Sequence, residues 1–547
     1  MLEIVNPVIR GFATDPSIIR VDDWYYVATS SFQWFPTIPL HRSADLAAWE
    51  HVGSVTTAAP GGSLAGLPDS GGVWAPSLSH DGDRFWVTYA IVRSVAAAYF
   101  DLTVYATWAR EIGGPWSEPI ALPSHGFDPS LFHHEGRHYL LNLQNDSRPE
   151  GRRFDGIVAT EVELDEHSAR PVGTTRLLLQ RDNLLEGPKL YHHTGRFYLV
   201  AAEGGTGWEH GALVARGENL FGPYEVDHRP FVTTRDAPDA PLQKTGHVEL
   251  VEAQSGAWFA TMLASRPVDS PHGPRCPLGR ETVIQPITWV DGWPRLRSGG
   301  HHPEVQIAVD GEHRAAAPAP DAVVQGLGTS WPWSTLRSPP GDWADTTTRP
   351  GWLRLVGQHG PESHWAVSLV AQRLAEHKAQ VEVTIDAEPT TFTQSAGLVL
   401  MYDATAYLTL HVTWAEPIGE AQHGQQWSGR GGRRVVALVQ RDSTGRRTVA
   451  THDLAPAGAV QLAATIEPTK VTFDVDGVSL GDELDITELS DDAGRLRFTG
   501  TMVGVSAHDT VDRAWTADFT AWTLRTTALQ AWDQNRTPTP AVIEAMA

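Results

Sequence analysis

The residues best suited to chemistry are acidic and stand at matching points of a repeated pattern. Asp15 and Asp128 open two similar Asp-Pro-Ser strings, Glu186 and His247 adjoin the corresponding point of two later copies, and Trp74 adjoins that of another. Carboxylates brought close together cannot all ionise easily, so at least one pKa should rise. A pair divided in this way, with one group protonated and the other ionised, is suited to hydrolysis of a glycosidic bond.

The repeat predicts how these side chains meet. Five copies begin at positions 15, 75, 128, 187 and 248, and each lies eleven residues before an aromatic residue in an apolar run, such as Tyr26 or Tyr139. This nearly even spacing, with short strands in each unit, is typical of a β-propeller. The innermost strands of a propeller begin near its axis, so we expect the five matching positions to share one pocket.

The strand pattern divides the chain into two β domains. Short aromatic and β-branched runs bounded by Gly, Asp or Asn, such as 24–29 and 197–202, are typical of strands. After a segment rich in Pro and Ala the strands continue without the repeat, and the Asp-Gly pair at 476–477 predicts a hairpin. We therefore expect an all-β fold with a five-bladed propeller over 1–312, a linker over 313–328, a concanavalin-like jelly-roll β-sandwich over 329–530 and a tail over 531–547.

Composition and charge narrow the partners. The net charge of −23 would repel a phosphate backbone, so we expect no nucleic-acid partner, and a neutral ligand fits better. No apolar run approaches the length that a membrane-spanning helix needs, which predicts no membrane span. The start of the chain lacks the pattern of a signal peptide, and Cys276 is the only cysteine, so no internal disulfide is possible. Both features predict a cytoplasmic protein.

Aromatic residues and one arginine are candidates for the pocket wall. Phe32, Trp34, Phe35 and Trp74 follow or flank inner strands, and the C–H faces of sugars pack on aromatic rings. The position of Trp74 at the start of an inner strand favours ligand contact, whereas Trp34 and Phe35 fit equally well as packing between blades. Arg280 is either a surface residue or a cation that faces the acidic centre and lowers the pKa of the carboxylate it touches.

Several longer strings give the chain a resemblance to a known family. The strings NPVIRGFATDPSIIRVDDWYYVATSSFQWFP, GFDPSLFHHEGRHYLLN, LLEGPKLYHHTGRFYLVAAEGGT, PLGRETVIQPITWVDGWPRL and FTGTMVGV resemble the two-domain β-xylosidase branch of glycoside hydrolase family 43, over nearly the whole chain. The resemblance implies a five-bladed propeller that hydrolyses glycosides with inversion. It implies that Asp15 is the general base that activates water and Glu186 the general acid. Asp128 would hold the acid in position and raise its pKa.

The resemblance also implies contacts to substrate and to an ion. Phe32, Trp74, Thr206 and Arg280 match positions that line the subsite for the terminal sugar. His247 matches a histidine at the base of the central channel, which in some relatives helps to hold a hydrated divalent ion, often calcium. The chemistry requires no cofactor, so the only ion expected is a structural Ca²⁺ in this channel.

Three residues depart from the family pattern near the expected substrate. Asn145 stands where relatives often have a tryptophan, and Lys189 replaces a histidine three residues after the acid. Met502 replaces a phenylalanine that in relatives reaches over the pocket. These differences leave the sugar open, because a wider pocket would accept α-L-arabinofuranosides as well as, or instead of, β-xylosides.

The leading hypothesis is an exo-acting glycosidase that releases xylose from the non-reducing end of β-1,4-xylo-oligosaccharides, since in relatives the sandwich domain blocks one side of the pocket. The alternative is an α-L-arabinofuranosidase, or a bifunctional enzyme, on the same site. A non-catalytic sugar-binding propeller is a third hypothesis, which the presence of all three carboxylates disfavours. Relatives of this branch are often dimers or tetramers, so a homo-oligomer is also considered.

Overall fold

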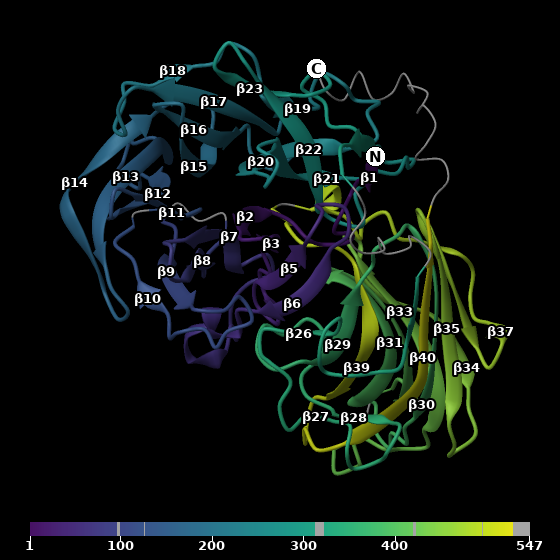
Figure 1. Ribbon diagram of the computed structural model, residues 1–547. Helices are drawn as coiled ribbons and strands as arrows, with labels where there is room; N and C mark the ends of the chain where they lie inside the picture. Colours follow the sequence, from purple (N-terminus) through teal and green to yellow (C-terminus); the bar gives the residue numbers. More distant parts are fainter. Residues whose placement is uncertain (96–98, 125, 312–321, 420–422, 495, 529–547) are drawn as a thin grey trace.

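The computed structural model describes residues 1–95, 99–124, 126–311, 322–419, 423–494 and 496–528. Two β domains lie side by side, the first a ring of five sheets and the second a pair of large sheets (Figure 1). The prediction of an all-β propeller followed by a β-sandwich is therefore confirmed. In the part of the chain that is described, no helix has the length and apolar character needed to cross a membrane.

Each blade is an antiparallel sheet whose first strand lies nearest the axis, since β2 contacts β7 and β20, and β11 contacts β7 and β15. The first three blades are β2 (Ser17–Val21), β3 (Trp24–Ala28), β5 (Pro39–Ser43) and β6 (Glu50–Ser54); β7 (Gly72–His80), β8 (Phe85–Val92), β9 (Leu102–Ala109) and β10 (Ile120–Ala121); and β11 (Ser130–His134), β12 (Arg137–Asn145), β13 (Phe154–Leu164) and β14 (Ala169–Leu179). The last two are β15 (Leu185–His193), β16 (Arg196–Glu203), β17 (Gly211–Gly217), β18 (Glu225–Val226) and β19 (Val232–Thr233); and β20 (Gln243–Glu252), β21 (Trp258–Ser265), β22 (Glu281–Val290) and β23 (Trp293–Leu296). Near the last blade, β1 (Leu2–Val5) pairs with β24 (Gln306–Val309).

At the repeat point of every blade the backbone adopts a left-handed conformation. The φ angle is 54° at Asp15, 23° at Ala75, 53° at Asp128, 55° at Gly187 and 53° at His247. For a residue other than glycine this region costs roughly 1–3 kcal/mol, and such residues cluster at functional sites, where the surrounding structure holds them in place. The shared conformation shows that these five positions are structurally equivalent.

The fifth blade departs from the predicted alignment by one residue. The sequence pattern placed its repeat point at Val248, but the left-handed residue is His247. Strand β20 has two register shifts before Glu249, which pairs with Thr261, twelve residues later. The matching pair in the first blade is eleven residues apart. The extra residue makes His247 the equivalent of Asp15.

Hydrogen bonds link each blade to the next close to the axis. The hydroxyl of Ser17 in the first blade donates to Glu249 of the fifth at 2.9 Å, and Lys189 of the fourth forms an ion pair with the same carboxylate. The other links run from the Ser130 hydroxyl to the Pro188 carbonyl, from the Thr88 hydroxyl to the Pro129 carbonyl and from the Leu78 N–H to the Ser17 hydroxyl. This circuit passes through all five blades and fixes the inner strands relative to one another.

The second domain encloses its core between two sheets. One contains β25 (Val323–Gln325), β27 (Ala344–Asp345), β28 (Leu353–Val356), β30 (Lys378–Asp386), β35 (Val460–Glu467), β36 (Lys470–Val475), β37 (Val478–Ser479), β38 (Leu484–Asp485) and β40 (Thr516–Thr527). The other contains β4 (Trp34–Phe35), β26 (Ser334–Leu336), β29 (Ser368–Arg373), β31 (Gln394–Asp403), β32 (Ala406–Ala415), β33 (Arg433–Asp442), β34 (Gly445–Asp453) and β39 (Met502–Asp509). Short 3-10 turns occur at Thr56–Ala58, Pro60–Gly62 and Asp491–Ala493.

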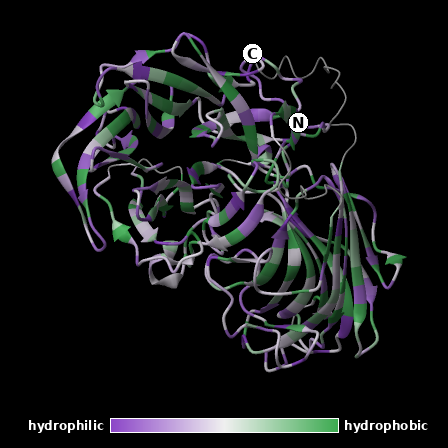
Figure 2. Cartoon of the chain, viewed as in Figure 1, coloured by the Kyte–Doolittle hydropathy of each residue, from purple (hydrophilic) through white to green (hydrophobic). Residues whose placement is uncertain are grey.

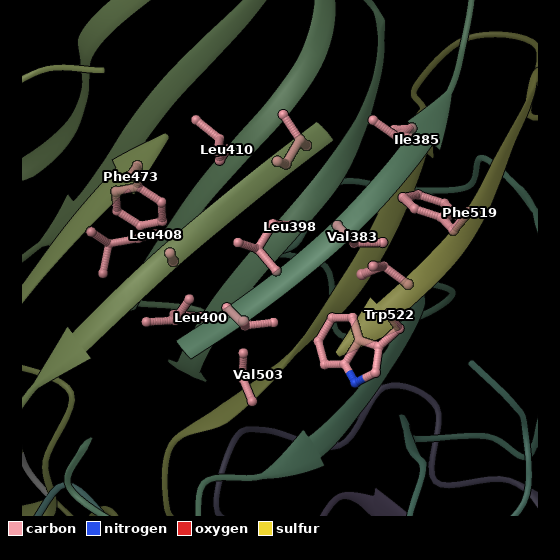
Figure 3. Packing of buried hydrophobic residues seen from close by; sticks show 14 of the residues in the cluster. Val383, Ile385, Leu398, Leu400, Leu408, Leu410, Phe473, Val503, Phe519 and Trp522 are labelled. Atoms are coloured by element: carbon pink, nitrogen blue, oxygen red, sulfur yellow. The ribbon is translucent and has the colours of Figure 1, made fainter. Parts of the chain in front are cut away.

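Alternation along the strands explains why the two sheets pack face to face. Hydrophobic and hydrophilic residues alternate along several sandwich strands (Figure 2), and in β30 every second residue is buried. Val383 and Phe519 of one sheet lie with Leu398 and Leu408 of the other in a single cluster (Figure 3). Side chains in a strand point alternately to opposite faces, so this pattern forms one apolar layer between the sheets.

The two domains share a sheet as well as side-chain contacts. Strand β4, which lies within the first blade in sequence, pairs with β26 of the sandwich. Trp34 and Phe35 are packing residues of 1% exposure each: Trp34 packs in a cluster with residues of the sandwich, and Phe35 packs in a cluster within the propeller. Arg266 of the propeller binds Glu376 of the sandwich at 2.7 Å.

The predicted boundary between the domains is only partly described. Strand β25, inside the segment 313–328 that was predicted as a linker, pairs with β40 and so belongs to the sandwich sheet. Sequence reasoning missed this strand because it is only three residues long. Residues 312–321 and the predicted tail over 531–547 lie outside the described part of the chain.

Candidate active site

A cavity of about 230 Å³ opens where the inner strands of the blades begin. Eight of the predicted site residues line it: Asp15, Phe32, Trp74, Asp128, Glu186, Thr206, His247 and Arg280. All five blades contribute at least one of them. The convergence that the repeat predicted is therefore present, and all three carboxylates face the same space.

The surroundings of Asp15 favour its ionised form. Its carboxylate accepts hydrogen bonds from the hydroxyls of Ser30 at 2.6 Å and Thr14 at 3.0 Å, and Nη1 of Arg280 lies 3.8 Å from Oδ1. Burial alone would raise the pKa of Asp15, but the charges of Arg280 and His247 and the two hydrogen bonds together hold it below its ordinary value. Asp15 is therefore a carboxylate that can accept a proton.

Glu186 has the opposite environment. Its side chain is buried, and Oε1 has no hydrogen-bond partner among the residues that the structure describes. Burial raises the pKa of Glu186, and the negative charge of Asp128 raises it further, to about 8. At neutral pH Glu186 therefore carries a proton that it can donate, while Asp15 in the same cavity is ionised.

Asp128 connects the acid to the histidine of the fifth blade. Its Oδ2 accepts a 3.0 Å hydrogen bond from the backbone N–H of Gly187 and lies 3.6 Å from Nε2 of His247. Burial would lower the pKa of His247, but the interaction with Asp128 and the charge of Asp15 outweigh it and raise that pKa. The His247 ring also packs against Gly187, where an added Cβ would lie only 2.7 Å from Nε2.

Arg280 lies between the propeller carboxylate and the sandwich. Besides its approach to Asp15, its Nη2 donates to the backbone carbonyl of Phe498 at 2.9 Å, and its guanidinium lies 5.6 Å from the centre of the Phe498 ring. Arg280 is 1% exposed, so the surface alternative considered from the sequence is wrong. Arg280 therefore lowers the pKa of Asp15 and at the same time binds Phe498 of the second domain.

The sandwich loop that carries Phe498 is anchored on the propeller at several points. Phe498 donates its N–H to the Ser70 hydroxyl at 3.0 Å. Earlier in the loop, Asp491 and Asp492 form ion pairs with Lys244 at 3.0 and 2.7 Å. The lysine side chain is 2% exposed and the two aspartate side chains are 7% and 9% exposed, so these ion pairs are buried. Because both ends of the loop are fixed, it holds Phe498 against the pocket.

Aromatic rings form a continuous wall around part of the cavity. Trp74 contacts Phe498 at a centroid distance of 5.3 Å, Phe127 at 5.4 Å and Phe32 at 6.2 Å. Farther along the wall, Arg153 lies between the rings of Phe100 and Phe154, at 4.9 and 5.2 Å from their centres. The sequence did not single out several of these lining residues, namely Val95, Phe100, Phe127, Arg153, Phe154, Leu184, Leu496 and Phe498. Of these residues, only Phe127 adjoins the repeated Asp-Pro-Ser string, since it directly precedes Asp128.

Two predicted contact residues lie elsewhere. Met502 is fully buried in β39, where it pairs with Arg373 and Met401, so it does not reach over the pocket. Phe498, four residues earlier, lines the cavity instead. Asn145 ends β12 and is absent from the lining, and the partner it faces across the sheet, Phe154, supplies an aromatic ring instead.

The environment of His247 does not fit the calcium site that the family resemblance implied. Nε2 of the ring lies 3.6 Å from Oδ2 of Asp128, too far for a hydrogen bond, and has no hydrogen-bond partner among the described residues. A divalent ion beside it would nevertheless meet a positive charge, because the buried ammonium group of Lys189 acts on His247 from the same part of the channel. No mechanistic step is therefore assigned to a metal ion.

Comparison with known proteins agrees with the order of the two domains. The pattern of glycosyl hydrolases family 43 matches residues 4–294, and that of the β-xylosidase C-terminal concanavalin A-like domain matches residues 327–525. The chain is 35% identical over 544 residues to xylosidase/arabinosidase 43B of Humicola insolens, in a match that covers 95% of this chain and 97% of that protein. It is also 35% identical over 545 residues to xylan 1,3-β-xylosidase of a Vibrio species, with coverage of 94% and 98%.

A solved structure extends the similarity to three dimensions. The crystal structure of xylan β-1,4-xylosidase from Bacillus halodurans C-125 superposes with a TM-score of 0.86 at 37% identity, covering 95% of this chain and 100% of that one. Both domains match in the same order, and the propeller brings three carboxylates into one cavity. The chain therefore belongs to glycosyl hydrolases family 43 and is a two-domain glycosidase.

Proposed function

We propose that this protein is an exo-acting, inverting β-xylosidase with Asp15 as general base, Glu186 as general acid and Asp128 as the residue that keeps the acid protonated. The observation that carries the proposal is the division of charge between Asp15 and Glu186 within one buried cavity. A sugar-binding protein has no use for two carboxyl groups held in opposite states, whereas hydrolysis of a glycosidic bond requires both.

The proposed reaction is a single displacement. Asp15 takes a proton from a water molecule as the water oxygen bonds to the anomeric carbon of the terminal sugar. The bond from that carbon to the glycosidic oxygen breaks, and Glu186 gives its proton to this oxygen, so the leaving sugar departs neutral. Water attacks from the face opposite the leaving group, so the configuration inverts. Arg280 keeps Asp15 ionised until it accepts the proton.

The size and closure of the cavity support removal of single terminal sugars. Its volume of about 230 Å³ lies below the roughly 300–1,000 Å³ of pockets that enclose drug-sized ligands. Leu496 and Phe498 of the sandwich close one side, while the blades form the rest of the wall. A closed pocket of this size favours the end of a chain over its interior. Phe100, Arg153 and Phe154 are then available to contact the leaving sugar.

The sugar and the linkage are the finer part of the proposal. We favour β-xylosides in β-1,4 linkage, in line with the name of the Bacillus halodurans structure at 37% identity. The Vibrio relative is named for the 1,3 linkage and the Humicola relative for both xylosidase and arabinosidase activity. An α-L-arabinofuranosidase activity on the same carboxylates is therefore the second candidate.

The experiment compares kcat/KM on the 4-nitrophenyl derivatives of β-D-xylopyranose and α-L-arabinofuranose, and on xylobioses with 1,4 and 1,3 linkages. Product configuration is followed by NMR before mutarotation. We expect the xyloside and the 1,4-linked disaccharide to be preferred and α-xylose to appear first. Preference for the arabinofuranoside would move the assignment to the second candidate, and β-xylose as the first product would contradict inversion.

A further inference from the structure

A buried ion pair lies in the axial channel beneath the carboxylates. Nζ of Lys189 is 2.5 Å from Oε1 of Glu249, and the two side chains are 9% and 5% exposed. Glu249 also accepts hydrogen bonds from the Ser17 hydroxyl and from the backbone N–H of Ile18. The carboxylate therefore has three partners. The hydrogen bonds from Ser17 and Ile18 fix its position, and Lys189 pairs with it there.

The pairing register shows that this ion pair breaks the symmetry of the channel. In the first three blades the equivalent position is a serine, Ser17, Ser77 or Ser130, and only the fourth and fifth blades place Lys189 and Glu249 there. The position follows the repeat point by two residues. Lys189 and Glu249 thus occupy the next level of the channel below the level of the three carboxylates.

The same level borders a second cavity. A polar space of about 380 Å³ is lined by the continuing inner strands of the five blades and includes both Lys189 and Glu249. The cavity above, which includes His247, includes neither of them. The ion pair therefore lies on the path between the active-site cavity and the space at the other end of the inner strands.

We propose that Lys189, whose ammonium group pairs with Glu249, supplies the permanent positive charge of this channel. Lys189 would thereby act as a positioning residue for His247, Asp128 and Glu186 above it. This assignment rests on the proposed function, because it gives Lys189 a role through residues assigned to catalysis. A divalent ion bound in this channel would be repelled by the buried ammonium group of Lys189, and the carboxylate of Glu249 is already paired with that ammonium group. The channel of this protein therefore works with a covalently attached cation in place of a metal.

Binding is tested first on the wild-type protein. Calorimetric titration of the metal-free protein with CaCl₂ should give no binding heat, and Ca²⁺ should not change the Tm. After treatment with a chelator, kcat/KM on 4-nitrophenyl β-D-xylopyranoside should stay within about twofold of the untreated value. One-to-one binding of Ca²⁺, or a loss of activity on chelation that Ca²⁺ restores, would overturn the proposal.

The decisive variant is Lys189→Ser, which places a fourth serine at this level and removes the cation that pairs with Glu249, while the hydrogen bonds from Ser17 and Ile18 to this carboxylate remain. We expect this variant to bind Ca²⁺ by calorimetry and to gain Tm on its addition. Its kcat without metal should fall at least about tenfold, while KM stays within about twofold because Lys189 does not line the sugar cavity. Ca²⁺ should restore part of the lost kcat.

Matched controls separate a cation site from simple loss of packing. The double variant Lys189→Ser/Glu249→Gln lacks the carboxylate and should not respond to Ca²⁺, whereas Lys189→Arg keeps a cation and should retain more kcat than Lys189→Ser. A Lys189→Ser protein that folds but ignores Ca²⁺, or that keeps the wild-type kcat without it, would contradict the proposal. If wild type does not cleave the xyloside, the proposed function fails, but the calorimetric comparison still tests the cation assignment. If Lys189→Ser does not fold, the wild-type titration remains the test.

Discussion

Oδ2 of Asp128 accepts a 3.0 Å hydrogen bond from the backbone N–H of Gly187, the residue directly after Glu186. The bond joins the third and fourth blades at the point where the proposed acid enters the cavity. It holds the two carboxyl side chains near each other although they lie far apart in the sequence. The negative charge of Asp128 is thereby kept where it raises the pKa of Glu186.

Removing the charge of Asp128 should shift the pH dependence of the reaction. In Asp128→Asn the pKa of Glu186 falls because its neighbouring anion is gone, so Glu186 loses its proton at lower pH. The basic limb of kcat/KM against pH should move down by about one unit or more, and kcat should fall. Asp165→Asn, which alters an exposed carboxylate of the same blade, is the control and should leave the profile unchanged. An unmoved limb in Asp128→Asn would remove Asp128 from the control of the acid.

The role of Glu186 as acid should depend on the leaving group. Xylobiose needs a proton on its departing oxygen, whereas nitrophenolate leaves without one. Glu186→Gln should therefore reduce kcat/KM on xylobiose by roughly 10²–10⁴-fold and on the nitrophenyl xyloside much less. Asp15→Asn should reduce both by similar factors, because both need an activated water. Equal losses on the two substrates in Glu186→Gln would argue against proton donation by this residue.

The same glutamate should limit stability in alkaline solution. Because the folded-state pKa of Glu186 is raised from 4.5 to about 8, its contribution to stability is fully present below pH 4.5 and is lost as the pH rises through about 8. Glu186→Gln has no charge to bury and avoids this loss. Its Tm relative to wild type should increase between pH 5 and pH 9, as measured by calorimetry. A Tm difference that is constant over this range would show that the acid is not buried as the structure indicates.

The sandwich should contribute to substrate binding through Phe498. In Phe498→Ala the wall beside Trp74 and Phe32 opens, so an aromatic surface for the terminal sugar is lost. We expect kcat/KM to fall about tenfold or more, equivalent to about 1.4 kcal/mol, chiefly through a higher KM. Phe392→Ala removes a half-exposed ring elsewhere on the sandwich and should change neither constant. Wild-type KM in Phe498→Ala would show that the second domain does not form the pocket.

The sequence predicted the fold and the charged centre well because both follow from the repeat. Matching positions in five blades converge by symmetry, so Asp15, Asp128 and Glu186 could be placed together without a structure. The repeat carries no information about the second domain, so the loop that brings in Phe498 was missed and Met502 was chosen instead. The fifth blade was misaligned by one residue because a strand irregularity, which no residue type signals, precedes Glu249.

The opposite protonation states of Asp15 and Glu186 are most directly tested by the pH dependence of kcat/KM on xylobiose in the wild-type enzyme. We predict a bell-shaped profile whose acidic limb lies below the ordinary aspartate range and whose basic limb lies near pH 8, where Glu186 loses its proton. A basic limb near pH 4 to 5, or a rate that does not fall above pH 9, would contradict the account.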